Sequence, residues 1–163
     1  MSAPTDQDKN QTKPVPRPTA SWATLAAIGV LAVIMGVSFV LLRPLIVLLP
    51  EDQRFTGITP DQLKALNGQL FAWIGMVFRS WGAFAIGLGT MIAAVAGTAY
   101  RRGDLWAWWT LATAGILTFG IFLTVNVFLG SDFKFVIALL LAAYLWALWY
   151  GRSSRRRVNG RQG

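Results

Sequence analysis

Apolar residues gather into four long runs, and short polar segments separate these runs from one another. The runs cover residues 20–49, 70–100, 105–130 and 133–150. A helix of about 20 apolar residues crosses the hydrocarbon core of a bilayer, which is roughly 30 Å thick. Backbone amides in that core meet no water, so runs of this length close their hydrogen bonds within helices. The pattern predicts an all-α membrane protein whose transmembrane domain covers residues 20–150.

The connections between the runs predict how consecutive helices are arranged. Residues 101–104 and 131–132 are so short that they make the flanking helices antiparallel neighbours. The first connection is longer and contains Thr59-Pro60-Asp61-Gln62, which is typical of a helix start with Thr59 as N-cap. Asn67-Gly68 would end this helix before the second span. We therefore expect four antiparallel transmembrane helices and a short outer surface helix.

The composition limits which domains, catalytic groups and cofactors the chain can have. Hydrophobic residues make up 55% of the 163-residue chain and charged residues 13%, so four spans leave no room for a soluble domain. Residues 1–19 are proline-rich and polar, and we interpret them as a disordered cytoplasmic tail. The chain contains neither cysteine nor histidine. This excludes thiolate catalysis and removes the commonest ligands of metal ions and haem, so we expect no metal site and no cofactor.

The distribution of basic residues predicts the orientation in the membrane. Ten of the 15 fall on one side of a four-span layout: Lys9, Lys13, Arg17, Arg101, Arg102, Arg152, Arg155, Arg156, Arg157 and Arg161. The opposite side carries Arg54, Lys64 and Lys134, diluted by acidic residues. The positive-inside rule then places both termini in the cytoplasm, with residues 151–163 as a basic cytoplasmic tail. Tryptophan and tyrosine residues near the same boundary agree with this orientation.

Small residues mark candidate helix contacts, because close approach of backbones drives helix association in lipid. In the second span Ala85, Gly89, Ala93 and Gly97 recur every four residues. Ala32-xxx-Gly36 in the first span and Ala143-xxx-Ala147 in the fourth could receive this stripe. Packing within the bundle is the first interpretation of the stripe, and contact with another subunit is the second.

Polar residues at one depth form the candidate functional site. Counting about 20 residues, or roughly 30 Å, from the inner boundary reaches Arg43 in the first span, Arg79 in the second and Asn126 in the third, with Ser80 beside Arg79. These four residues could bind a small anion or a lipid headgroup, because two guanidinium groups suit phosphate or carboxylate.

Two other interpretations of this layer stay open. Both arginines could be ordinary interfacial anchors that lipid headgroups solvate. Alternatively, either arginine could form an ion pair with Asp132, Asp61 or Asp52 within the chain, which would weaken an anion site.

The remaining charges indicate lipid contact and no catalysis. Arg155, Arg156 and Arg157 predict contact with anionic lipid of the inner leaflet, whereas the folded aromatic platform that nucleic-acid binding needs is lacking. None of the seven acidic residues lies at mid-membrane depth, which disfavours a proton-coupled carrier. A serine or threonine nucleophile would have no histidine base, so we do not expect an enzyme.

About a third of the chain resembles a pattern found in small uncharacterised bacterial four-helix integral membrane proteins. The segments that carry the resemblance are 58–63, 78–82 and 100–109, the last reading Tyr-Arg-Arg-Gly-Asp-Leu-Trp-Ala-Trp-Trp. The resemblance implies a bacterial cytoplasmic membrane and a four-helix layout, and it transfers no activity. We expect a non-catalytic accessory subunit of a larger membrane complex, with membrane lipids and other membrane subunits as partners. The alternative is an independent membrane protein that binds or transports lipid or a small solute through the arginine layer.

Overall fold

The computed structural model describes residues 16–43 and 45–159, and the side chains of the last helix up to Ser153. All regular structure in this part of the chain is helical. Four of its helices are long and apolar enough to cross a membrane. They are α1 (Thr19–Leu41), α4 (Gly68–Val95), which continues as the π-helix η2 (Ala96–Tyr100), α5 (Leu105–Phe128) and α6 (Lys134–Asn159).

Helix α1 is shorter than the hydrophobic run 20–49, because it ends at Leu41. Pro44 disfavours helical backbone at the preceding residue and offers no amide hydrogen for the helix to continue. Beyond it, Val47 and Leu48 are buried against Leu63 in a small second core. The first connection therefore covers part of the apolar surplus of the run, while Leu45 and Ile46 stay exposed.

That connection holds two short helices, α2 (Pro50–Thr56) and α3 (Pro60–Leu66). The predicted helix start at Thr59 is present: its hydroxyl accepts a hydrogen bond from the Gln62 amide at 3.3 Å. In return the Gln62 side chain accepts one from the Thr59 amide at 2.9 Å. Helix α2 was not predicted, and it ends at Gly57, whose φ of 71° suits glycine.

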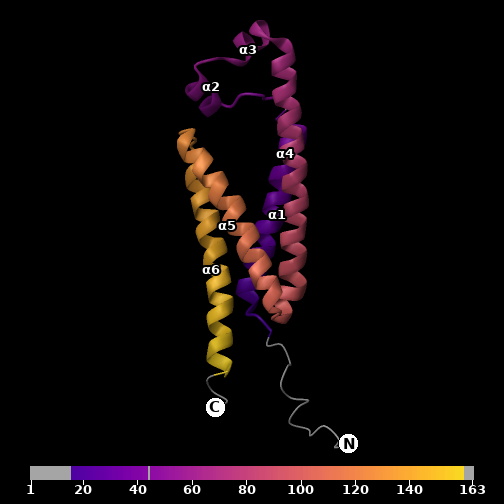
Figure 1. Cartoon of the computed structure of the whole chain (residues 1–163), viewed down its shortest axis with the longest axis vertical. Helices are drawn as coiled ribbons and strands as arrows, with labels where there is room; N and C mark the ends of the chain where they lie inside the picture. Colours follow the sequence, from indigo (N-terminus) through magenta and orange to yellow (C-terminus); the bar gives the residue numbers. More distant parts are fainter. Residues whose placement is uncertain (1–15, 44, 160–163) are drawn as a thin grey trace, which may run out of the picture.

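The helices form two pairs, in which α1 lies beside α4 and α5 beside α6 (Figure 1). Four glycines bring α1 and α4 together. A Cβ atom at Gly89 would lie 2.5 Å from the carbonyl oxygen of Gly29, and one at Gly82 would lie 2.7 Å from that of Gly36. Higher-numbered residues of α1 thus meet lower-numbered residues of α4.

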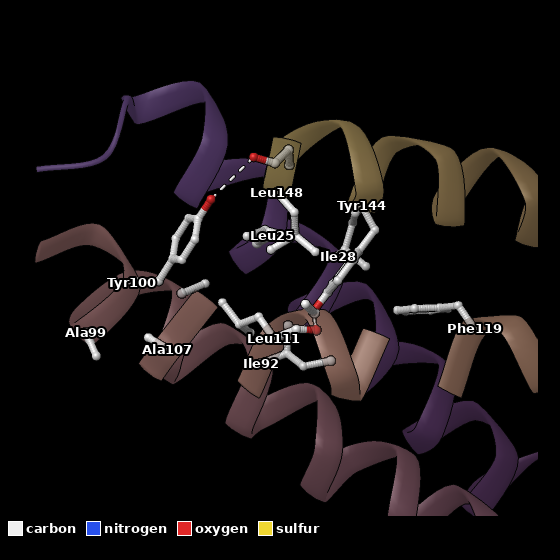
Figure 2. Packing of buried hydrophobic residues seen from close by; sticks show 13 residues of the cluster. Leu25, Ile28, Ile92, Ala99, Tyr100, Ala107, Leu111, Phe119, Tyr144 and Leu148 are labelled. Atoms are coloured by element: carbon white, nitrogen blue, oxygen red, sulfur yellow. Dashed lines mark hydrogen bonds between the residues drawn. The ribbon is translucent and has the colours of Figure 1, made fainter. Parts of the chain in front are cut away.

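One apolar core joins the two pairs at the end where α1 begins and η2 ends, here called the termini end (Figure 2). Leu25 of α1, Ile92 of α4 and Leu111 of α5 are almost fully buried there. The Tyr144 ring of α6 lies over Gly115 of α5, and its hydroxyl donates a hydrogen bond to the Leu111 carbonyl at 2.8 Å. The Tyr144 ring thereby packs α6 against α5, and only glycine at position 115 leaves room for this ring.

Candidate functional site

Arg43, a residue of the predicted polar layer, is buried just after α1. Its Nη2 atom donates to Asp52 Oδ2 at 3.0 Å, and its Nη1 atom donates to the carbonyls of Ile46 and Val47 at 3.3 Å. The same carboxylate oxygen of Asp52 accepts the Leu49 amide at 2.8 Å. This cluster fastens the segment that follows α1 to the first turn of α2.

Two aromatic rings complete the surroundings of Arg43. Its guanidinium carbon lies 3.9 Å from the ring centre of Phe78 on α4 and 5.5 Å from that of Phe39 on α1. Phe39 in turn packs on Trp81, with 4.7 Å between ring centres. Cation–π contacts of this kind strengthen when water is excluded. The ion pair and the two rings surround the Arg43 guanidinium, so Arg43 connects α1, α2 and α4 within the chain.

The other three residues of the predicted layer do not converge on Arg43. Arg79 is exposed, and it has no hydrogen-bond or ion-pair partner among the residues described. The Ser80 hydroxyl donates to the Met76 carbonyl at 3.2 Å, and the Asn126 amide donates to Phe122 at 2.9 Å. Each of these two side chains is thus satisfied by its own helix. Although the sequence places Arg43, Arg79, Ser80 and Asn126 at a similar depth, their side chains do not form one site.

Only part of the predicted stripe of small residues contacts another helix. Gly89 and Ala93 face Gly29 of α1, whereas a Cβ atom at Gly97 would meet open space and Ala85 is only half buried. The backbone contacts of α4 instead follow a seven-residue spacing through Gly82 and Gly89.

The predicted acceptors of that stripe lie in two different places. Ala32 and Gly36 lie against α4. Ala147 is fully buried, and its carbonyl accepts hydrogen bonds from Ser21 of α1 and Tyr100 of η2. Arg155, Arg156 and Arg157 belong to the last turns of α6, but their side chains lie outside the described part of the structure.

A pocket on α4 is the main feature that the sequence did not reveal. It is open, has a volume of about 460 Å³, and is lined by Trp73, Met76, Val77, Ser80, Trp81 and Phe84, which we call the aromatic face of α4. These residues recur at three- and four-residue intervals, so they share one side of the helix. That spacing was the available signal, but in an apolar span it does not distinguish a pocket from ordinary lipid contact.

Helix α2 also contacts the turn between α5 and α6. Arg54 Nη2 lies 2.9 Å from Asp132 Oδ2 in an exposed ion pair, and the Ser131 hydroxyl donates to Glu51 at 3.4 Å. The hydrogen bond with Arg54 and the positive charge of Arg54 lower the pKa of Asp132, and the same hydrogen bond and the negative charge of Asp132 raise the pKa of Arg54. Helix α2 therefore links the two helix pairs at the end opposite the core.

Comparison of the chain with protein-family models, with curated proteins and with solved structures finds no match.

Proposed function

We propose that α1, α4 with η2, α5 and α6 cross a bacterial cytoplasmic membrane as antiparallel neighbours. Both termini then lie in the cytoplasm, and α2 and α3 lie on the outer surface. The excess of basic residues at the termini and in the α4–α5 connection supports this orientation. The lengths of the four helices support the spans.

Within that membrane we propose a non-catalytic subunit of a larger complex. The aromatic face of α4 is the surface that would contact the partner. Phe84 is 78% exposed and Trp73 57% exposed, although both side chains are large and lie on a helix whose other side is tightly packed. An open apolar surface of rings and a flexible methionine fits a side chain from a neighbouring helix.

The proposal depends on one observation, which is that Arg79 has no hydrogen-bond or ion-pair partner among the described residues. A cation within an apolar span is costly unless it is paired or reaches the headgroups. Arg79 lies three residues beyond Met76 and therefore beside the aromatic face on the helix surface. Because no described residue pairs with it, a partner helix that carries an acidic side chain at this level would satisfy its charge.

The second candidate function is independent binding of a lipid or small solute. It is favoured by Ser80, a polar residue that lines the pocket together with Trp73 and Trp81. In that case Arg79 would meet the phosphate or carboxylate of the ligand.

Gentle detergent extraction of the full-length chain, followed by mass analysis, tests the choice. We expect other membrane proteins to co-purify in fixed ratio, and Phe84→Ala and Arg79→Gln to reduce that recovery. The matched controls are Leu139→Ala, an exposed apolar residue of α6, and Arg102→Gln, an exposed cation paired with Asp104. Recovery of a lone monomer or homo-oligomer from native membranes would contradict the subunit proposal and favour the second candidate.

A further inference from the structure

Two tryptophans occupy equivalent places at the termini end. Trp22 is the fourth residue of α1, and Trp108 is the fourth residue of α5. Each is followed at the same spacing by a buried leucine, Leu25 or Leu111. Because both helices begin at this end and share one core, the two indole rings lie at a similar level.

An arginine side chain lies over each indole ring. Arg101 directly follows η2, and Arg152 belongs to α6. The guanidinium carbon of Arg101 lies 4.9 Å from the ring centre of Trp22, and that of Arg152 lies 4.7 Å from the ring centre of Trp108. The Trp108 ring is itself held, because its Nε1 atom donates to the Leu148 carbonyl at 3.2 Å. Both arginines are exposed.

The guanidinium groups of Arg101 and Arg152 keep their hydrogen-bonding edges available. Neither group has an ion pair or a hydrogen bond to any described side chain or carbonyl. A guanidinium that lies over an aromatic ring can keep the N–H donors along its edge for another acceptor. An edge of this kind binds two oxygens of a phosphate at once.

Arg17 ties the two positions together. Its backbone amide donates to the Arg101 carbonyl at 2.9 Å, and its guanidinium donates to the carbonyl of Gly151, the residue before Arg152. Arg17 itself is buried, with its guanidinium 5.1 Å from the Tyr100 ring centre. One buried residue thus forms hydrogen bonds with the backbone of Arg101 and of the residue before Arg152.

We propose that Arg101 on Trp22 and Arg152 on Trp108 are two headgroup contacts for anionic phospholipids in the leaflet at the termini end. Indole rings favour the headgroup level of a bilayer, where a guanidinium meets phosphate while the acyl chains follow the apolar helix. Exposed Trp106 and Trp149 extend the aromatic surface at the same end. The inference is separate from the proposed partner surface, which lies on α4 around Arg79.

The test counts the lipids that the purified full-length chain retains by native mass spectrometry, after exchange into phosphatidylglycerol or phosphatidylcholine. We expect retention of phosphatidylglycerol to fall about fivefold for each of Arg101→Gln and Arg152→Gln, because one basic residue near an anionic surface contributes about 1 kcal/mol. Arg102→Gln is the control: it removes the same charge from the neighbouring residue, which pairs with Asp104 at 3.7 Å. This control should retain lipid as the unmodified chain does.

Three results would overturn the proposal. They are unchanged retention in the double Gln variant, an equal loss in Arg102→Gln, and equal retention of phosphatidylcholine and phosphatidylglycerol by the unmodified chain. Displacement of the lipid by inorganic phosphate would assign the sites to a free anion instead. If a Gln variant does not fold, the Arg→Lys variants decide: they keep the charge but lose the planar edge, and full retention in them contradicts the stacked geometry.

Discussion

Gly29 and Gly89 bring the backbones of α1 and α4 into direct contact. A Cβ atom at Gly89 would lie 2.5 Å from the Gly29 carbonyl oxygen and 2.8 Å from the Val33 nitrogen, both backbone atoms. Backbone cannot move aside as the end of a flexible side chain can. The two helices would therefore have to separate to admit any larger residue at position 89.

The first prediction follows from this contact. Gly89→Ala and Gly89→Leu should lower the free energy of unfolding, by about 1–3 kcal/mol for overpacking, with the larger loss for leucine. Thermal unfolding of the purified chain in one detergent measures the effect. Gly87→Ala is the matched control, because a Cβ atom there meets open space. Equal melting temperatures for Gly89→Leu and Gly87→Ala would contradict the packing.

The fold could be predicted from the sequence as far as local signals reach. Four apolar runs of sufficient length indicated four long helices, and Thr59-Pro60 indicated a capped helix start, since both signals depend on neighbouring residues only. Pro44 is a local signal for the end of α1, and Pro50 and Gly57 are local signals for the bounds of α2. The path of the chain between the two helices depends on the burial of Val47 and Leu48 against Leu63, which is a tertiary contact that no local pattern encodes.

The residues of the predicted polar layer do not converge, for a geometric reason. Counting residues along each run gives the depth of a side chain but not its direction around the helix axis. Arg43 stacks on Phe78, and consecutive helical residues point about 100° apart, so Arg79 is turned away from Arg43. Only Gly89 and Ala93 of the small-residue stripe face Gly29, because the contacts follow a seven-residue spacing, which departs from a four-residue repeat after two turns.

The second prediction concerns Arg43 and Asp52, whose side chains are 11% and 14% exposed. Arg43→Gln would leave the Asp52 carboxylate without its cation in a nearly buried place and should cost about 3 kcal/mol of unfolding free energy. Arg43→Lys should keep only part of the unfolding free energy that Arg43→Gln loses, because lysine lacks the planar group that lies over the Phe78 ring.

Arg79→Gln is the control for Arg43, because it removes a cation from the same level without breaking any ion pair among the described residues. The double variant of Arg43 and Arg79 should show the sum of the two single effects, because the residues share no partner. Strong non-additivity in thermal unfolding would restore the shared anion site.

The third prediction is a pH dependence of the α2 link. The Arg54 guanidinium lowers the pKa of Asp132 below its ordinary value of 3.8. A depressed pKa means that the folded state releases the proton more readily, so the ion pair stabilises the fold above the unfolded pKa. This contribution is lost as the pH falls through the depressed value. Asp132→Asn should therefore melt below the unmodified chain at pH 6, and the difference should shrink in strong acid.

The exposed Asp61 supplies the control for this pH experiment, because no ion pair to it is found in the part of the chain that the structure describes. Asp61→Asn should leave the acid limb of the melting profile unchanged. A difference between the unmodified chain and Asp132→Asn that persists at full size at pH 2 would show that charge is not the cause.

The last prediction is the orientation in the membrane. The chain contains no cysteine, so a single introduced thiol reports one position without interference. Ala65→Cys on exposed α3 should react with a membrane-impermeant maleimide in intact cells, whereas Ser2→Cys should react only after the cells are permeabilised. The reason is the charge asymmetry, because the termini and the α4–α5 connection carry most basic residues, and such segments stay in the cytoplasm. Labelling after permeabilisation confirms that each thiol is reactive. The reverse pattern would invert the topology and move the Arg101 and Arg152 contacts to the outer leaflet. Labelling of both positions in intact cells would place both outside and so exclude α1 as a single span between them.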